Sequence, residues 1–451
     1  MINKFNLNPN AKEDSKVSFT KAFYSKELNR LIPGGAHTYS RGDDQYPENA
    51  PSILERGKGA YVWDPDGNKF LDYGMGLRSV TLGYDYEPVS DAAIAEIRKG
   101  NNLTRPSVTE YKAAKLLNEL IPCAEMVKFG KNGSTVTSAA IKLARAYTGR
   151  KFAAMCAEHP FFSYDDWFIG TTPMQKGIPQ EQTSFSLTFH YNDIASLQNL
   201  FDKYPNQIAA IILEPATYIP PKDNFLHKVK ELCQKNGAVF ILDEMITGFR
   251  WHLQGASKYY DIQPDLATFG KAMGNGFPLS ALTGKKEIME LGGILNEGAE
   301  RVFLISTTHG SEMSSLGAFI ETVKVYQEKD VCVHLWDYGK KLIDGMNSIA
   351  KDAGIENYFS AEGYACSPYY FTKDKAGKAS FEFRTLFSQE MIKSGVLMPW
   401  IALSYAHGEK ELEVTLAAVR KSLDVYKKAL ESGIENYLKG RIIKPVFRKF
   451  N

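Results

Sequence analysis

A run of apolar residues that ends in two acids constrains the fold of this 451-residue chain more than any other feature. Residues 237–242 read Gly-Ala-Val-Phe-Ile-Leu, and Asp243 and Glu244 follow directly. Consecutive apolar residues, some of them β-branched or aromatic, predict a strand that is buried on both faces. Asp243 then lies where a parallel strand meets its loop, which is the edge at which open α/β sheets bind ligands.

A second strand ends in an amine. Residues 264–271 read Pro-Asp-Leu-Ala-Thr-Phe-Gly-Lys, and the loop after Lys271 contains Gly274 and Gly276, which give it a flexible backbone. An anion from one strand and an amine from the next suit pyridoxal phosphate, because a lysine forms a Schiff base with its aldehyde and an aspartate keeps its pyridine nitrogen protonated. Either charge alone is more often a solvated loop residue. The pair is therefore what indicates cofactor chemistry.

The order of predicted elements indicates an α/β fold. Strand-like runs at 209–213, 239–242, 267–269 and 279–283 alternate with helices, which predicts a parallel sheet with helices on both faces. Helical spacing covers 109–120 and 134–148, and an Asp-Pro-Asp-Gly turn predicts a hairpin over 61–72. We expect an arm at 1–60, with a charged helix near 18–30, and a large domain at 61–320. A long helix after Ser314 should lead into a smaller α+β domain at 321–435. A basic tail follows at 436–451.

Composition limits the possible partners and compartment. The chain is 44% hydrophobic and 24% charged, as in ordinary globular proteins, and its net charge of +2 gives no general attraction to nucleic acid or membrane. Its five cysteines show no metal-type spacing, its eight histidines no paired spacing, and its first residues no apolar leader. We expect a cytoplasmic protein with reduced thiols, no metal, small-molecule substrates, and neither a nucleic-acid nor a membrane partner.

A possible phosphate site precedes the helix predicted at 134–148. Residues 130–135 read Gly-Lys-Asn-Gly-Ser-Thr. Gly133 permits close backbone approach, Ser134 offers a hydroxyl, and a helix N-terminus favours an anion. Asn-Gly-Ser before a helix is also an ordinary N-cap, so both interpretations stay open.

The two strand ends also carry a family resemblance. Leu-Asp-Glu-Met-Ile-Thr-Gly-Phe-Arg at 242–250, followed by Pro-Asp-Leu-Ala-Thr-Phe-Gly-Lys at 264–271, resembles the class III (fold type I) pyridoxal phosphate-dependent aminotransferases, and within them most of all the glutamate-1-semialdehyde 2,1-aminomutases. The similarity extends from about residue 33 to 423. It implies a fold type I enzyme with pyridoxal 5'-phosphate as cofactor, a large domain with a mixed, mostly parallel sheet, a smaller α+β domain, and a homodimer.

The resemblance assigns roles to several residues. It makes Lys271 and Asp243 catalytic, and it aligns Asn132, Gly133 and Ser134 with the phosphate loop, although Thr135 replaces the usual Glu. The remaining cofactor contacts that it implies are Phe161 stacked on the ring, Glu214 near the lysine linkage, Met245 above the ring where Val is common, and Thr308 donated by the second subunit. Phe161 could equally be a core residue, Glu244 has a supporting role, and the alignment at Thr308 is ambiguous by two residues.

The substrate is less constrained. The segment from Pro33 to Arg41 has the spacing of the aminomutase motif whose Arg binds the substrate carboxylate, so Arg41 is a candidate carboxylate ligand or an ordinary surface arginine. The family's Ser-Trp-Gly is replaced by Gly-Leu-Arg at 76–78, and the segment 395–404 is shorter and lacks a glutamate. This altered pocket favours amino transfer between two molecules by a ping-pong mechanism, to an oxo substrate such as a sugar-derived ketone.

Three alternatives remain for comparison. Glutamate-1-semialdehyde aminomutase activity, which is intramolecular amino transfer, would use every one of the same cofactor residues. A non-catalytic binding module with this fold should lack Lys271 or Asp243, and both are present. A nicotinamide enzyme is disfavoured because no Gly-x-Gly-x-x-Gly follows a strand with an acidic residue about 20 positions later.

Overall fold

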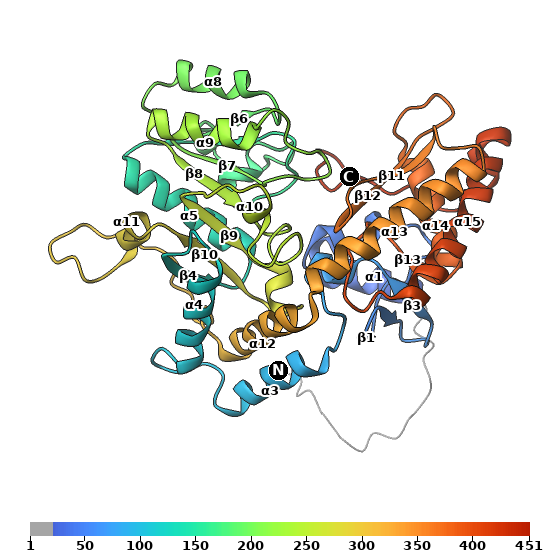
Figure 1. Cartoon of the computed structure of the whole chain (residues 1–451). Helices are drawn as coiled ribbons and strands as arrows, with labels where there is room; N and C mark the ends of the chain where they lie inside the picture. The colour runs from blue at the N-terminus through green and yellow to red at the C-terminus, as the bar shows by residue number, and fades with distance from the viewer. Residues whose placement is uncertain (1–20) are drawn as a thin grey trace, which may run out of the picture.

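A computed structural model describes residues 21–451 and shows two lobes that are joined along one side (Figure 1). The larger lobe contains a seven-stranded sheet, and the smaller lobe combines segments from both ends of the chain. The predicted charged helix is present as α1 (Lys21–Leu31), and the part of the predicted arm before residue 21 lies outside the described residues.

The seven-stranded sheet has the order β4-β10-β9-β8-β7-β5-β6. Its strands are β4 (Met126–Gly130), β5 (Phe152–Cys156), β6 (Ser186–Phe189), β7 (Ile208–Leu213), β8 (Val239–Asp243), β9 (Leu266–Phe269) and β10 (Ser280–Gly284). The fold prediction is confirmed: the sheet is mixed but mostly parallel, and only β10 runs antiparallel to both of its neighbours. The strand predicted at 279–283 therefore exists but does not continue the parallel alternation, because the short link after β9 lacks the crossover that a parallel pair needs.

Helices cover both faces of this sheet. On one face α5 (Gly133–Thr148) packs against side chains such as Ala210 and Ile241, and on the other α8 (Ile194–Lys203) and α9 (Phe225–Asn236) pack against side chains such as Ile211 and Phe240. Neighbouring strand residues thus point to opposite faces and are all buried. This explains why each parallel strand is a continuous apolar run in the sequence.

The smaller lobe contains a second, four-stranded sheet with the order β1-β2-β3-β13. Its strands are β1 (Arg56–Lys58), β2 (Tyr61–Trp63), β3 (Lys69–Asp72) and β13 (Val396–Leu397). The predicted hairpin is β2–β3, and β3 pairs in parallel with the C-terminal strand β13. We therefore propose that 56–72 belongs with the C-terminal segment rather than with the large domain in which the sequence placed it.

Helices and a hairpin complete the smaller lobe. These elements are β11 (Phe359–Tyr364), β12 (Ser367–Thr372), α13 (Val331–Asp352), α14 (Phe381–Lys393) and α15 (Glu409–Ser432). The long helix expected after Ser314 is α12 (Met313–Lys329), and α13 follows it after Asp330, which has a left-handed φ of 48°. The remaining α-helices are α2 (Met75–Arg78), α3 (Glu87–Arg98), α4 (Val108–Leu120), α6 (Asp166–Ile169), α7 (Gln180–Thr183), α10 (Ala256–Tyr259) and α11 (Lys286–Met289).

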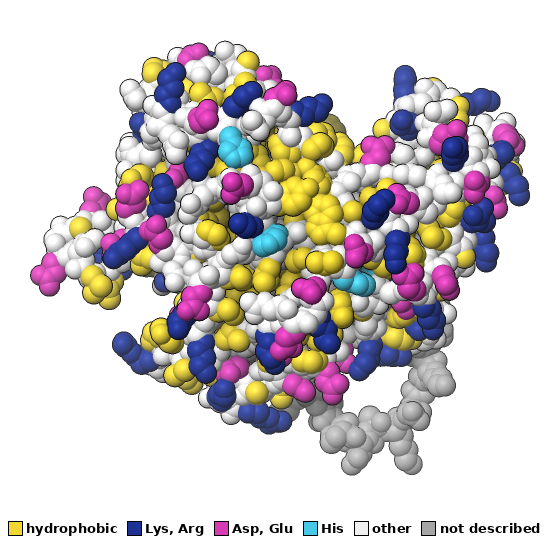
Figure 2. Space-filling view, viewed as in Figure 1, with side chains coloured by type: hydrophobic (Ala, Val, Ile, Leu, Met, Phe, Trp, Pro, Cys, Tyr) yellow, Lys and Arg dark blue, Asp and Glu magenta, His cyan; other side chains and the backbone are white. Residues whose placement is uncertain are grey.

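Aromatic rings join the two lobes. Trp251 packs against Tyr364 of β11 with ring centroids 4.0 Å apart, and Tyr259 of α10 stacks on Trp336 of α13 at 5.5 Å. Figure 2 shows hydrophobic side chains gathered on the face between the lobes. The C-terminal tail makes a further link, because Phe447 contacts Phe168 of the larger lobe at 6.2 Å. Within residues 21–451, no helix is long and apolar enough to cross a bilayer.

Candidate active site

Asp243 ends β8 with one carboxylate oxygen held by the protein and the other left open. Its Oδ1 accepts hydrogen bonds from the Met245 amide and from Thr268 Oγ1, each at 3.0 Å. Its Oδ2 has no donor among the described residues and is not fully enclosed. Burial raises the pKa of Asp243 to about 6, against the opposing effect of the Lys271 charge. Oδ2 is therefore an available acceptor in a desolvated site.

Lys271 lies next to Asp243, just beyond β9. It is half-buried and has a φ of 44°, a left-handed conformation that is strained for a lysine. Its amine makes no hydrogen bond within residues 21–451 and is not fully enclosed. Desolvation lowers the pKa of Lys271, although the carboxylates of Asp243 and Glu214 raise it. The result is an accessible amine with an increased tendency to be neutral.

Glu214 follows β7, the next strand of the sheet, and is 4% exposed. Its Oε1 is buried and has no partner among the described residues. Burial, together with the nearby Asp243, raises the pKa of Glu214. Its amide donates to Nδ1 of the buried His159 at 2.9 Å, and burial lowers the pKa of His159 to about 4. The sequence does not indicate a role for His159, because a single histidine without a metal-type or motif spacing carries no signal.

The start of α5 offers open amides at the same edge of the sheet. Asn132 is the N-cap, and its Oδ1 accepts from the Thr135 amide at 3.0 Å. The amides of Gly133 and Ser134, in the first turn, have no intrahelical acceptor. Ser134 Oγ accepts from the Tyr164 amide at 3.0 Å and keeps its own proton to donate. The Asn132 side chain thus caps the helix, while the amides of Gly133 and Ser134 can bind an anion.

The Met245 side chain packs between this helix start and Gly270, the residue before Lys271. A Cβ atom added to Gly133 would lie 2.9 Å from Met245 Sδ, and one added to Gly270 would lie 2.6 Å from it. Both glycines are therefore needed for the close approach of the methionine. Glu244, by contrast, accepts hydrogen bonds from Thr247 Oγ1 and from the amides of Ala256 and Ser257 (2.9 and 2.7 Å). It therefore stabilises the loop between β8 and α10.

Three residues predicted for the site lie at the surface. Phe161 is 45% exposed and stacks on Phe447 of the tail with ring centroids 6.5 Å apart. Thr308 is exposed, and its carbonyl accepts from Asn102 Nδ2 at 3.1 Å. Arg41 is exposed and makes no ion pair with any residue from 21 to 451. No contact in the structure joins any of the three to Lys271.

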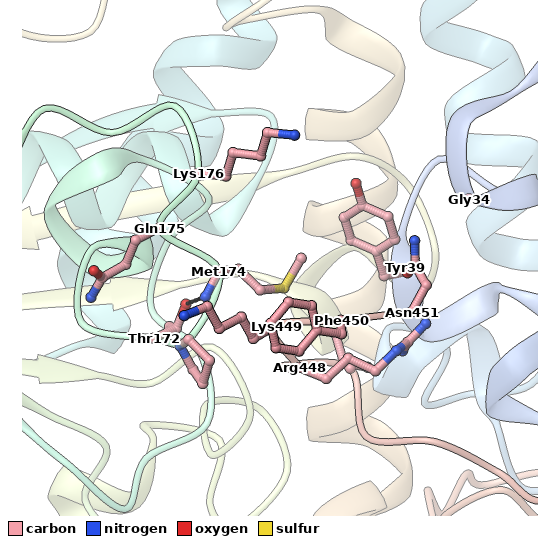
Figure 3. A pocket seen from close by; sticks show the side chains of 12 residues that line it. Gly34, Tyr39, Thr172, Met174, Gln175, Lys176, Arg448, Lys449, Phe450 and Asn451 are labelled. Carbon is pink, nitrogen blue, oxygen red and sulfur yellow. Dashed lines mark hydrogen bonds between the residues drawn. The ribbon is translucent and has the colours of Figure 1, made fainter.

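A large cavity lies elsewhere, next to the C-terminal tail. It measures about 1000 Å³ and is lined by residues of the N-terminal segment, of the loop at 172–176 and of the tail. Figure 3 shows Tyr39, Met174 and Phe450 around one space. Asp243, Glu214 and Lys271 do not line it, so this cavity is separate from the three titratable groups at the sheet edge.

These groups fit pyridoxal phosphate. The open Oδ2 of the buried Asp243 matches a pyridine N–H, open amides at a helix start match a phosphate, and an accessible lysine matches an aldehyde. No group of three or more His, Cys, Asp or Glu that could hold a metal occurs in the part of the chain that the structure describes.

Comparisons with known proteins agree with this chemistry. Residues 43–367 match the family described as aminotransferase class-III. The chain is 31% identical over 433 residues to a glutamate-1-semialdehyde 2,1-aminomutase of Francisella philomiragia, covering 90% of this chain and 98% of that protein. It is 32% identical over 416 residues to a 3-aminobutyryl-CoA aminotransferase of Cloacimonas acidaminovorans, covering 90% and 97%. The pyridoxal phosphate form of the FumI protein of Sphingopyxis sp. MTA144 superposes with a TM-score of 0.83 at 26% identity, covering 91% and 97%.

Proposed function

Because the chain belongs to the class III aminotransferase family, we propose that it is a pyridoxal phosphate-dependent aminotransferase that moves an amino group from an amino donor to an oxo acceptor. The observation that carries this proposal is the pairing of the open Asp243 Oδ2 with the accessible amine of Lys271 on adjacent parallel strands.

Each residue of the site has a task in this reaction. When bound, pyridoxal phosphate withdraws electrons and makes the proton on the amine-bearing substrate carbon labile. Asp243 Oδ2 would accept the pyridine N–H, and the amides of Gly133 and Ser134 would hold the phosphate. Lys271 Nζ, whose pKa is lowered by desolvation, accepts the proton from the substrate carbon and can return it to another atom.

The aminomutase alternative is supported by relatives of similar identity. It needs a pocket that retains one molecule through both half-reactions, whereas an aminotransferase releases its first product. The replacement of the family's Ser-Trp-Gly by Gly-Leu-Arg at 76–78 favours the aminotransferase, because the aromatic wall is lost and a charge is gained.

We also propose a cytoplasmic homodimer in which Thr308 contacts the cofactor phosphate of the second subunit. Ile294, Leu295 and Phe303 are 74%, 83% and 73% exposed on a segment that extends from the body next to α11 in Figure 1. Exposed apolar side chains of this kind favour contact with a second subunit, which would bury them. The five cysteines are all free thiols, which is consistent with a reducing compartment.

The visible spectrum of the cofactor-loaded protein tests the activity. We expect one amino donor from a panel to bleach the visible band and an oxo acid to restore it. A band that responds only to a diamine or an amino aldehyde would favour the aminomutase. A loaded protein whose band responds to no amine would contradict both activities.

A further inference from the structure

A left-handed turn next to the active site holds its backbone in an unusual conformation. The φ angles of Met75, Gly76, Leu77 and Arg78 are 39°, 57°, 62° and 67°. Left-handed helical geometry costs about 1–2 kcal/mol for each residue that carries a Cβ atom. Such backbone persists only where its surroundings hold it, and it is concentrated at functional sites.

Several side chains hold this turn in place. The Asp72 carboxylate accepts from the amides of Gly74 and Met75 at 2.7 and 2.9 Å. The amide of Gly76 donates to the Tyr84 hydroxyl at 2.9 Å, which itself donates to Asp72 at 2.6 Å. These bonds hold the backbone of the turn that ends at Arg78.

The end of the turn is held by a second arginine. Arg250 Nη2 donates to the Arg78 carbonyl at 2.9 Å, and its Nη1 donates to the Leu403 carbonyl at 3.0 Å. Arg250 is 1% exposed, so this link lies within the protein. The position of Arg78 is therefore set by both lobes.

The Arg78 side chain is buried and only partly bonded. It is 8% exposed, its Nη1 donates to Ser367 Oγ at 2.8 Å, and its guanidinium carbon lies 5.0 Å from the centre of the Tyr369 ring. Nε and Nη2 donate to no described residue, and neither atom is fully enclosed. These two nitrogens share one edge of the guanidinium, which is the geometry that binds a carboxylate through two parallel hydrogen bonds.

No carboxylate of the described residues forms a direct ion pair with this cation. Within residues 21–451, no carboxylate lies within 4.0 Å of the Arg78 guanidinium. A buried charge without a partner is costly, so its retention indicates that a ligand supplies the partner.

Arg78 also lies within electrostatic reach of the candidate active site. Its charge lowers the pKa of both Lys271 and Glu214. The Tyr369 ring under its guanidinium packs on Tyr218 at 5.3 Å, and Tyr218 belongs to the loop that begins at Glu214. The open edge of Arg78 and the Lys271 amine therefore belong to one site.

We propose that Arg78 is a specificity-determining residue that binds a carboxylate of the substrate while Lys271 acts at the amine-bearing carbon. This inference rests on the proposed function of Lys271. It gives the substrate a class, namely an amino or oxo acid, and it gives the carboxylate contact to Arg78 rather than to the exposed Arg41.

Binding of unreactive probes tests this role. Succinate and its uncharged diamide have no amino or oxo group, so calorimetric titration of the cofactor-loaded protein measures binding alone. We expect succinate to bind the wild type at least about tenfold more tightly than the diamide, and Arg78→Gln to remove that preference, because a hydrogen bond to a charged group is worth about 1.5–3 kcal/mol.

Three further variants make the result specific. Arg384→Gln is the matched control, because the Arg384 guanidinium also lies over a tyrosine ring, 4.6 Å from that of Tyr370, and it donates to the Pro399 carbonyl at 2.7 Å. It should leave the preference unchanged, and so should Arg41→Gln. Arg78→Lys keeps the charge but loses the paired bonds, so an intermediate preference is expected even if Arg78→Gln does not fold.

The possible outcomes separate the two proposals. The inference is overturned if the wild type shows no preference for succinate, if Arg78→Lys matches the wild type, or if Arg41→Gln causes the loss. Succinate binding that depends on Arg78, in a protein that transfers no amino group, would contradict only the proposed function. Amino transfer with binding that is indifferent to Arg78 would contradict only this inference.

Discussion

Thr268 Oγ1 donates a hydrogen bond to Asp243 Oδ1 at 3.0 Å, and the two residues are direct partners in the parallel pair β8–β9. This register determines the site, because Lys271 follows Thr268 by only three residues and so emerges next to the carboxylate. Thr268 and the Met245 amide both donate to Oδ1 of Asp243, which leaves Oδ2 for a ligand.

The amine of Lys271 is expected to be essential. Lys271→Ala should abolish the visible band of the bound cofactor and lower turnover by at least about 10²–10⁴-fold, because the proton acceptor is removed. Absorbance and single-turnover kinetics would measure both effects. Lys285→Ala, which removes a half-buried lysine paired with Asp265 at 2.6 Å, should change neither. Normal turnover by Lys271→Ala would refute the mechanism.

The buried carboxyl of Glu214 should make the stability of the cofactor-free protein depend on pH. Because the pKa of Glu214 is raised above its ordinary 4.5, the folded chain holds this proton when the unfolded chain has lost it. The stabilisation is complete below about pH 4.5 and is lost as the pH rises through the folded pKa. Relative to Glu214→Gln, the wild type should lose up to about 1.4 kcal/mol per pH unit in that window.

Urea unfolding of both proteins at pH 5 and pH 7 would measure this difference. A constant gap between wild type and Glu214→Gln would mean that Glu214 is ionised in the folded protein at both pH values.

The close packing of Met245 against Gly133 predicts a compensating pair of substitutions. Gly133→Ala would bring a Cβ atom to 2.9 Å from Met245 Sδ and should weaken cofactor binding by about 1–3 kcal/mol, because the site becomes overpacked. Met245→Ala in the same chain should restore part of the affinity. Gly408→Ala, which meets only Glu411 Oε2 at 3.4 Å, is the control. Failure of Met245→Ala to restore any affinity would mean that the clash with Met245 does not cause the loss of cofactor binding.

Arg250 should contribute strongly to stability. Arg250→Met loses the bonds to the Leu403 and Arg78 carbonyls and should lower the free energy of unfolding by about 3 kcal/mol or more. Arg420→Met, which removes an exposed ion pair with Asp352 at 3.7 Å, should cost about 0–1 kcal/mol. Equal effects in denaturant titration would argue against a central role for Arg250.

The ring contact between Phe161 and Phe447 of the tail should contribute to the free energy of unfolding. A double-mutant cycle with Phe161→Ala and Phe447→Ala is expected to give a coupling energy of about 0.5–1.5 kcal/mol for the stacked rings. Additive effects of the two substitutions would indicate that the ring contact contributes nothing to the stability of the folded chain.

The sequence by itself determined the central strands and the charges at their ends. A parallel strand that is covered on both faces must be apolar throughout, so β7, β8 and β9 are visible as local runs. Parallel strands also place their carboxyl ends at one edge, which brings Glu214, Asp243 and Lys271 together without any knowledge of distant contacts.

Only the tertiary structure decided the direction of β10, the pairing of β3 with β13 and the place of Arg78. Each depends on contacts between segments that are distant in the chain, which local periodicity does not encode. The left-handed turn at Met75–Arg78 has no propensity signal of its own, since Asp72, Tyr84 and Arg250 stabilise it from outside. The sequence could therefore indicate the residues proposed to act on the amino group, Asp243 and Lys271. Only the fold indicated Arg78, the residue proposed to bind the substrate carboxylate.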